Sequence, residues 1–118
     1  MRNTIKKHID FETADGDIVA RSAGFLVRMR KTRFPGDARY GLIVTKRTFR
    51  HAVDRNRARR LLRVWIRHGD KLLRSDCDYV FIARPTILRW GLGDGVGAMK
   101  RALRYLKHQS VHVKKDAQ

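Results

Sequence analysis

Nine cationic side chains lie between Lys46 and Arg67, and Asp54 is the only acidic residue among them. A guanidinium group can pair with two phosphate oxygens at once and can stack on an exposed base, so this arginine-rich run favours nucleic acid as a ligand. Like charges spaced by four residues destabilise an isolated helix by roughly 0.2–0.5 kcal/mol per pair. A bound polyanion would offset that repulsion. The nine residues are Lys46, Arg47, Arg50, Arg55, Arg57, Arg59, Arg60, Arg63 and Arg67.

Two alternatives apply to this run. A charged run on a helix is often only a solvated face, but such a face normally carries both signs, and acidic residues are almost absent here. Asn56 lies between Arg55 and Arg57 and can either satisfy local backbone donors or hydrogen-bond a phosphate, a ribose or a base edge. The residue types leave the role of Asn56 open.

A helix over residues 51–68 is expected to hold the basic run. Four apolar side chains cluster on one arc of this helix, and we expect a row of arginines at i, i+4 spacing on the opposite side. Trp65 belongs to the apolar arc, so we expect it in the core rather than stacked on a base. Gly69 provides a helix end. The arc contains Ala58, Leu61, Leu62 and Trp65, and the row contains Arg55, Arg59, Arg63 and Arg67.

The remaining pattern predicts an α+β domain in the order α-β-β-β-α-β-α. Strands 25–30 and 39–46 are joined by a short connection, so we expect them to pair as an antiparallel, hairpin-like unit. The apolar run at 79–83 is typical of a strand buried on both faces. The other expected elements are a helix at 6–14, a strand at 18–20, a strand at 78–84 that includes the apolar run, a helix at 94–108 capped by Asp94, and a polar tail at 109–118.

The composition limits the class of protein. The chain has 118 residues, 28 Lys plus Arg against 11 Asp plus Glu, and a net charge of +17, so we expect one domain over residues 1–118, with its core at about 8–108, and a polyanionic partner. No apolar run is long enough to span a bilayer, and the N-terminus lacks a signal-peptide pattern. Cys77 alone can form neither an internal disulfide nor a cysteine zinc site, and His108 and His112 lack a third ligand. We therefore expect a cytoplasmic protein without a membrane segment or a metal site.

Six segments together match the motifs of one known family. They are Asp10-Phe11, Phe25-Leu26-Val27, Tyr40 to Arg47, Ala52-Val53-Asp54, Arg55-Asn56-Arg57 continued to Arg63, and Asp78 to Arg84. In this order and spacing they resemble the bacterial ribonuclease P protein subunit, whose signature helix begins Arg-Asn-Arg. The resemblance implies a single αβββαβα sandwich with a central mixed sheet and a left-handed βαβ crossover, similar to domain 2 of ribosomal protein S5.

The resemblance also implies a function. The family protein is the subunit of a ribonucleoprotein endoribonuclease whose catalytic centre, with its Mg²⁺ ions, lies in the RNA. It binds that RNA and the 5′ leader of precursor tRNA, one protein to one RNA, and it broadens the substrate range while the leader is removed. No catalytic residue and no cofactor are therefore expected in this chain. The alternative is a general RNA-binding module, such as a ribosomal or architectural protein.

Site residues follow from the same resemblance. Many family members use aromatic side chains to stack leader bases, whereas this chain has Asp15 and Arg28 at such positions, so we expect Arg28 and Arg30 to replace part of the stacking with phosphate contacts. The residues expected to bind the catalytic RNA are Lys46, Arg47, Arg55, Asn56, Arg57, Arg59, Arg60, Arg63 and Arg67, and those expected to bind the leader are Phe11, Phe25, Val27, Arg28 and Arg30.

Overall fold

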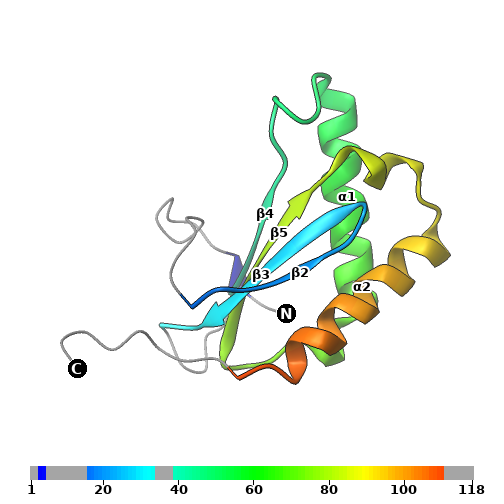
Figure 1. The fold of residues 1–118 in the computed structure, drawn as a ribbon. Coiled ribbons are helices and arrows are strands. Elements are labelled where there is room, and N and C mark those ends of the chain that lie inside the picture. Colours follow the sequence, from blue (N-terminus) through cyan, green and yellow to red (C-terminus); the bar gives the residue numbers. More distant parts are fainter. Residues whose placement is uncertain (1–2, 5–15, 34–38, 111–118) are drawn as a thin grey trace.

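The computed structural model describes residues 3–4, 16–33 and 39–110, and within them a five-stranded mixed sheet packs against two helices (Figure 1). The predicted helix at 6–14, Phe11 and the tail beyond Ser110 lie outside the described residues. The strands are β1 (Asn3–Thr4), β2 (Ile18–Arg21), β3 (Phe25–Lys31), β4 (Arg39–Ile43) and β5 (Cys77–Ala83); the helices are α1 (Ala52–His68) and α2 (Leu92–Lys107), and the short 3-10 segments are η2 (Asp70–Leu72) and η3 (Pro85–Arg89). The predicted α+β class is confirmed.

The sheet order is β1-β4-β5-β3-β2, which places β5 between the two strands expected to form a hairpin. β5 runs antiparallel to β3 and parallel to β4, so the predicted pairing of strands 25–30 and 39–46 is wrong. The physical reason is that β5 is buried along almost its whole length. The backbone N–H and C=O groups of such a strand need hydrogen-bond partners on both edges, which a neighbouring strand on each side provides. The parallel pair β4 and β5 is connected through α1, as a βαβ unit requires. The left-handed sense of that crossover stays a prediction.

Helix boundaries follow the sequence closely. α1 spans Ala52–His68 and ends at Gly69, as the apolar periodicity and the glycine predict. α2 begins at Leu92, two residues before the predicted start, and Gly91 occupies the N-cap position. Asp94 is therefore not the cap but an exposed residue of the first turn, where its charge still complements the positive end of the helix dipole.

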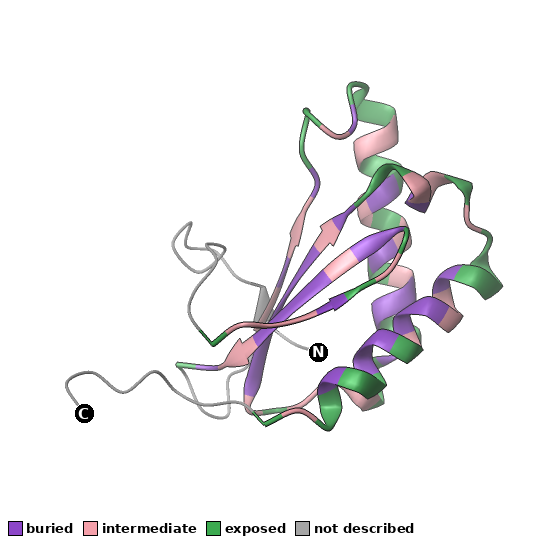
Figure 2. Ribbon diagram, viewed as in Figure 1, coloured by how far each residue is buried: buried purple, intermediate pink, exposed green. Residues whose placement is uncertain are grey.

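The core lies between one face of the sheet and the two helices (Figure 2). Successive residues of a strand point to opposite faces, so Phe25, Val27 and Met29 of β3 all face the helices, and none of them has any exposed surface. Trp65 of α1 is also fully buried and lies with its ring centroid 6.3 Å from that of Phe25, which confirms its predicted place in the core.

The opposite face of the sheet carries charged side chains. Asp78 of β5 is buried and binds β4 through Arg39, whose backbone N and Nη2 donate to the two carboxylate oxygens of Asp78 at 2.8 Å each. This pair fixes the register of the two parallel strands at the end where β4 begins, because both bonds join the first residue of β4 to β5. The pair also removes one arginine from the charge available to a ligand.

Candidate RNA-binding surface

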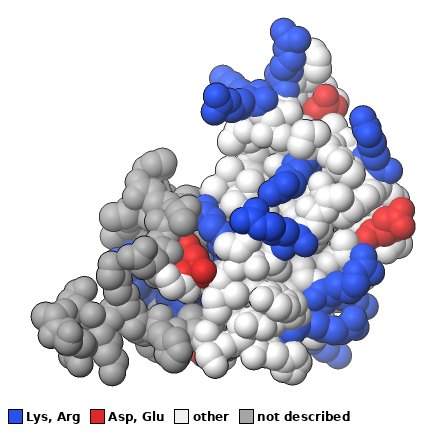
Figure 3. All heavy atoms as spheres, in the orientation of Figure 1, with Lys and Arg blue, Asp and Glu red and all other residues white. Residues whose placement is uncertain are grey.

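Lys and Arg side chains gather at the end of the molecule formed by the β4–α1 loop and the first turns of α1 (Figure 3). Lys46 and Arg47 are exposed in that loop. Along α1 the exposed polar residues continue from the Arg-Asn-Arg segment to the last turn. We call the exposed set of Lys46, Arg47, Asn56, Arg57, Arg60, Arg63 and Arg67 the α1 surface.

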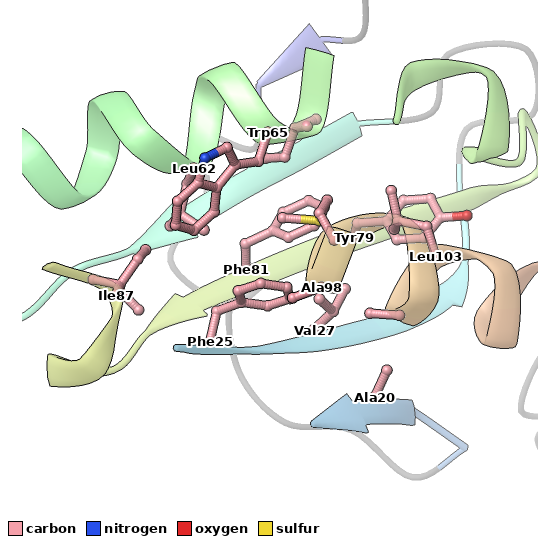
Figure 4. Packing of buried hydrophobic residues seen from close by; sticks show 14 of the residues in the cluster. Ala20, Phe25, Val27, Leu62, Trp65, Tyr79, Phe81, Ile87, Ala98 and Leu103 are labelled. Atoms are coloured by element: carbon pink, nitrogen blue, oxygen red, sulfur yellow. The ribbon is translucent and has the colours of Figure 1, made fainter. Parts of the chain in front are cut away.

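The opposite side of α1 fixes the direction in which the α1 surface points. Ala58, Leu62, Trp65 and Ile66 are buried, and the Leu62 and Trp65 side chains point towards the sheet residues Phe25 and Phe81 (Figure 4). Because the apolar side of the helix is anchored in this way, its polar side must face outward. The structure thus confirms that one side of α1 is apolar and packs on the sheet.

The predicted arginine row is only partly on the outward side. Arg63 and Arg67 are exposed, whereas Arg55 and Arg59 are partly buried. The reason is geometric: four residues turn a helix by about 400°, so an i, i+4 row drifts by about 40° at each step. Over this length the row moves from the flank of the helix onto its exposed face. Arg60 does not belong to the predicted row, but it lies on the exposed face of α1.

Arg55 contacts the chain itself. Its Nη1 donates to the backbone carbonyl of Phe49 at 3.0 Å and to that of Arg50 at 3.1 Å. Phe49 is buried, and its backbone N donates to the carbonyl of Thr45 at 2.9 Å, which closes a turn in the same loop. Arg55 therefore fastens the loop that presents Lys46 and Arg47.

Asn56, whose role the sequence left open, does not cap the helix. Its Oδ1 accepts a hydrogen bond from Arg59 Nη1 at 3.3 Å, and the helix has no side-chain cap bond. Within the described residues the Asn56 amide nitrogen makes no hydrogen bond, and the side chain is exposed. An amide whose oxygen accepts such a bond retains two N–H donors, which suit a phosphate or a ribose hydroxyl.

The cations of the α1 surface differ from the other basic residues in their ion pairing. In the part of the chain that the structure describes, the ion pairs involve arginines and a lysine of the strands and of the segment before β5, and none involves a cation of the α1 surface. Within the described residues, ion pairs therefore do not neutralise the positive charge of this surface, and a polyanion would gain from contact with several side chains at once.

The residues predicted to bind the leader are not brought together on one exposed surface. Phe25 and Val27 lie in the core with no exposed surface, so the prediction that they contact the leader is wrong for both. Strand alternation explains the error: the motif places them on a strand, but which face of that strand is covered by the helices depends on the whole fold. Phe11 lies outside the described residues.

Arg28 and Arg30 lie on the other face of β3, and both face Asp17. Arg30 Nη2 is 2.8 Å from Asp17 Oδ2, and Arg28 Nη1 is 3.8 Å from the same oxygen. Burial lowers the pKa of Arg28, and the Asp17 carboxylate acts in the opposite direction. Arg28 is buried, but the Arg30 side chain keeps 22% of its surface exposed, so Arg30 is the more accessible of the two.

Within the described residues, no three His, Cys, Asp or Glu side chains lie together as a metal site would need. Among the same residues, no helix is both long and apolar enough to cross a membrane. His108 is exposed at the end of α2, and His112 lies outside the described residues.

Comparison with known proteins decides the family. A family model described as Ribonuclease P matches residues 1–107. The chain belongs to the Ribonuclease P family. A relative named ribonuclease P protein component, from Marinomonas sp. (strain MWYL1), is 38% identical over 79 residues. That match covers 66% of this chain and 59% of the relative, so the chain spans less than two thirds of the relative's length.

Solved structures of Ribonuclease P proteins share this fold. The Staphylococcus aureus RNase P protein superposes with a TM-score of 0.74 at 21% identity, covering 91% of this chain and 97% of the other. The Thermotoga maritima RNase P protein gives a TM-score of 0.63 at 20% identity, covering 75% of this chain and 83% of the other. At such identities the likeness supports the arrangement of the elements alone.

Sequence reasoning missed one group of basic residues in this Ribonuclease P family chain. Lys71, Lys100 and Arg104 lie around the C-terminal end of α1 together with Arg67. In the sequence, the one pattern that pointed to this group is the i, i+4 spacing of Lys100 and Arg104 on the predicted last helix. Their proximity to Arg67 depends on how α2 packs against α1, which spacing does not reveal.

Proposed function

We propose that this chain is the protein subunit of a ribonuclease P and binds the catalytic RNA of that enzyme through the α1 surface. The observation that carries the proposal is a set of exposed arginines on α1, the helix that contains the Arg-Asn-Arg segment. Within the described residues none of them forms an ion pair; they are Arg57, Arg60, Arg63 and Arg67. Arginine forks suit a structured RNA because they fit phosphate oxygens in pairs.

In this proposal the chemistry belongs to the RNA. The catalytic centre and its Mg²⁺ ions lie in the RNA, and one protein binds one RNA molecule. The chain contributes positive charge that reduces repulsion between the RNA and its substrate, so fewer free cations are needed for the same activity. Removal of the 5′ leader from precursor tRNA is the reaction that the complex would perform.

We place the leader contact at Arg30 on the sheet face opposite the helices. Asp17 holds the Arg30 guanidinium in one orientation at 2.8 Å, and the side chain is still partly exposed. A partly exposed guanidinium held in one orientation presents a positive charge that suits the oxygens of a phosphate. This face is separate from the α1 surface, so one chain can contact two RNAs.

The test of the main proposal is reconstitution with the catalytic RNA from the same source. Cleavage of precursor tRNA at low Mg²⁺ should be much faster with the protein than with RNA alone. Arg60→Ala/Arg63→Ala should weaken RNA binding and lower its salt slope by about two units, one for each phosphate that the variant no longer neutralises. Arg101→Ala/Lys107→Ala removes the same charge from exposed positions of α2 and should leave the slope nearly unchanged.

The possible results of the reconstitution distinguish three functions: ribonuclease P subunit, general RNA-binding module and protein nuclease. Binding without any gain in cleavage rate would favour a general RNA-binding module, and cleavage by the protein without RNA would mean that the chain itself is a nuclease. The leader assignment has its own readout: Arg30→Ala should reduce the preference for precursor over mature tRNA. An unchanged preference would place the leader elsewhere.

A further inference from the structure

A second basic feature lies where the C-terminal end of α1 meets α2. The last turn of α1, the following η2 segment and the middle of α2 line an open pocket of about 420 Å³. Its lining includes Arg67, Lys71, Lys100 and Arg104, and Asp70 is the acidic residue among its lining residues. A pocket of this size is within the range that binds small ligands or groups.

The charges of the four cations are not neutralised by ion pairs in the part of the chain that the structure describes. Within the described part of the chain, none of them forms an ion pair, and Asp70 lies farther from each of them than an ion pair allows. Lys100 and Arg104 are separated by one helical turn, so their charges repel each other. Four cations around one hollow raise the local potential, and the group that relieves it best is an anion with several oxygens.

We propose that this pocket, named here the α1–α2 pocket, binds a backbone phosphate of RNA. The inference rests on the proposed function and extends it to a second contact region. Arg67 belongs both to the α1 surface and to this pocket, so the two basic regions are continuous. An RNA segment that follows the α1 surface would reach the pocket without a break, and we therefore assign the phosphate to the catalytic RNA rather than to the substrate.

The pocket is held in place before any ligand binds. The backbone N of Gly69 donates to the carbonyls of Trp65 and Ile66, and that of Leu72 donates to the carbonyl of Gly69 at 2.9 Å. A Cβ at Gly69 would lie 2.9 Å from Leu103 Cδ1, which shows how closely the turn sits against α2. Preformed walls reduce the ordering cost of binding.

A further bond connects the segment after η2 to the end of α2. Arg74 Nη1 donates to the carbonyl of Gln109 at 2.6 Å, and its Nη2 donates to Asp76 at 3.0 Å. The segment that carries Lys71 is thus fastened on both sides, by the helix turn before it and by Arg74 after it. The backbone that carries the cations of the pocket is therefore held in place by hydrogen bonds.

The first experiment compares two double variants on the same helix. Lys100→Ala/Arg104→Ala removes two cations of the pocket, and Arg101→Ala/Lys107→Ala removes two that lie outside it. Binding of the catalytic RNA is measured across salt concentrations, after circular dichroism shows that both variants fold. We expect the salt slope to fall by about two units for the pocket variant and to change little for the control. Equal slopes for the two variants would overturn the inference.

The proposed function is measured in parallel with Arg60→Ala/Arg63→Ala. If that variant lowers the slope while the pocket variant matches its control, the pocket inference fails and the proposed function stands. If the α1 variant keeps the wild-type slope, the proposed RNA-binding surface itself is wrong.

The second experiment identifies which RNA reaches the pocket. Cys77 has no exposed surface, and burial, with a smaller contribution from Asp76, raises the pKa of its thiol to about 12. A thiol with these properties reacts slowly, so Lys71→Cys can be labelled selectively with an iron chelate that cleaves nearby RNA. We expect cleavage in the catalytic RNA, at nucleotides different from those cleaved from Arg57→Cys. Cleavage confined to the precursor tRNA, or no cleavage, would overturn the assignment.

Discussion

Arginines of this chain differ in function according to their partners. Arg57, Arg60 and Arg63 are exposed on α1, and within the described residues none of them forms an ion pair. Arg55 instead donates to backbone carbonyls of the preceding loop, and Arg30 pairs with Asp17. A count of cations in the sequence therefore overestimates the charge available to RNA, because some guanidinium groups are used within the fold.

The structure predicts that Arg55→Ala acts through the loop. Removal of two hydrogen bonds to carbonyls should lower the free energy of unfolding by about 1 kcal/mol. RNA affinity should also fall, because Lys46 and Arg47 are no longer held in place. Urea denaturation and salt-dependent RNA binding measure the two effects.

The matched control is Arg57→Ala, an exposed position two residues later. It should lower the salt slope by about one unit, and its stability should stay within about 0.5 kcal/mol of the wild type. If Arg55→Ala instead behaves like Arg57→Ala, with full stability and a slope lower by one unit, then Arg55 binds phosphate directly.

At the scale of elements, the packing of α2 on α1 depends on one glycine. A Cβ at Gly95 would overlap the indole of Trp65, so the two helices approach too closely there for any side chain. Trp65 is fully buried and packs against Phe25 and Trp90, so a shift of its ring would disturb both contacts. The position of α2, and with it that of the α1–α2 pocket, follows from this close approach.

Gly95→Ala should therefore destabilise the protein by about 1–3 kcal/mol, the usual cost of overpacking a core. Gly93→Ala is the control, because it lies on the same helix, is exposed, and its Cβ would meet no atom within 4 Å. This control should be neutral or stabilising by about 0.5–1 kcal/mol, since alanine favours a helix over glycine. Chemical denaturation measures both, and equal stabilities would show that the close approach to Trp65 can relax.

On the scale of the whole molecule, the net charge of +17 opposes folding of the free protein. Salt screens this repulsion, with a Debye length of about 10 Å at 0.1 M ionic strength. We expect the thermal midpoint of the free protein to rise when the ionic strength increases from roughly 0.05 to 0.3 M.

Removing charge should have the same effect as adding salt. Arg60→Ala/Arg63→Ala should raise the midpoint at low salt and reduce its response to further salt, because two mutually repelling cations are gone. Thermal unfolding followed by circular dichroism gives both quantities. A midpoint that falls with salt would show that ion pairs such as Arg39–Asp78 outweigh the repulsion.

By itself, the sequence determined the features that depend on near neighbours. The apolar arc of α1 and its end at Gly69 are local patterns, as is the fully apolar run of β5, and the structure confirms all three. The motifs also indicated the family, which the match over residues 1–107 shows. These features are readable because helical and strand periodicities repeat over a few residues.

Only the tertiary structure decided which distant residues meet. β5 inserts between β3 and β4, which overturned the expected hairpin, and Phe25 and Val27 turned out to face the core. Asp17 pairs with Arg30 across 13 positions of the chain, and Arg67 meets Lys100 around one pocket. The physical reason is that strand order, the covered face of a sheet and helix packing are set by contacts between residues far apart in the chain, which no local period encodes.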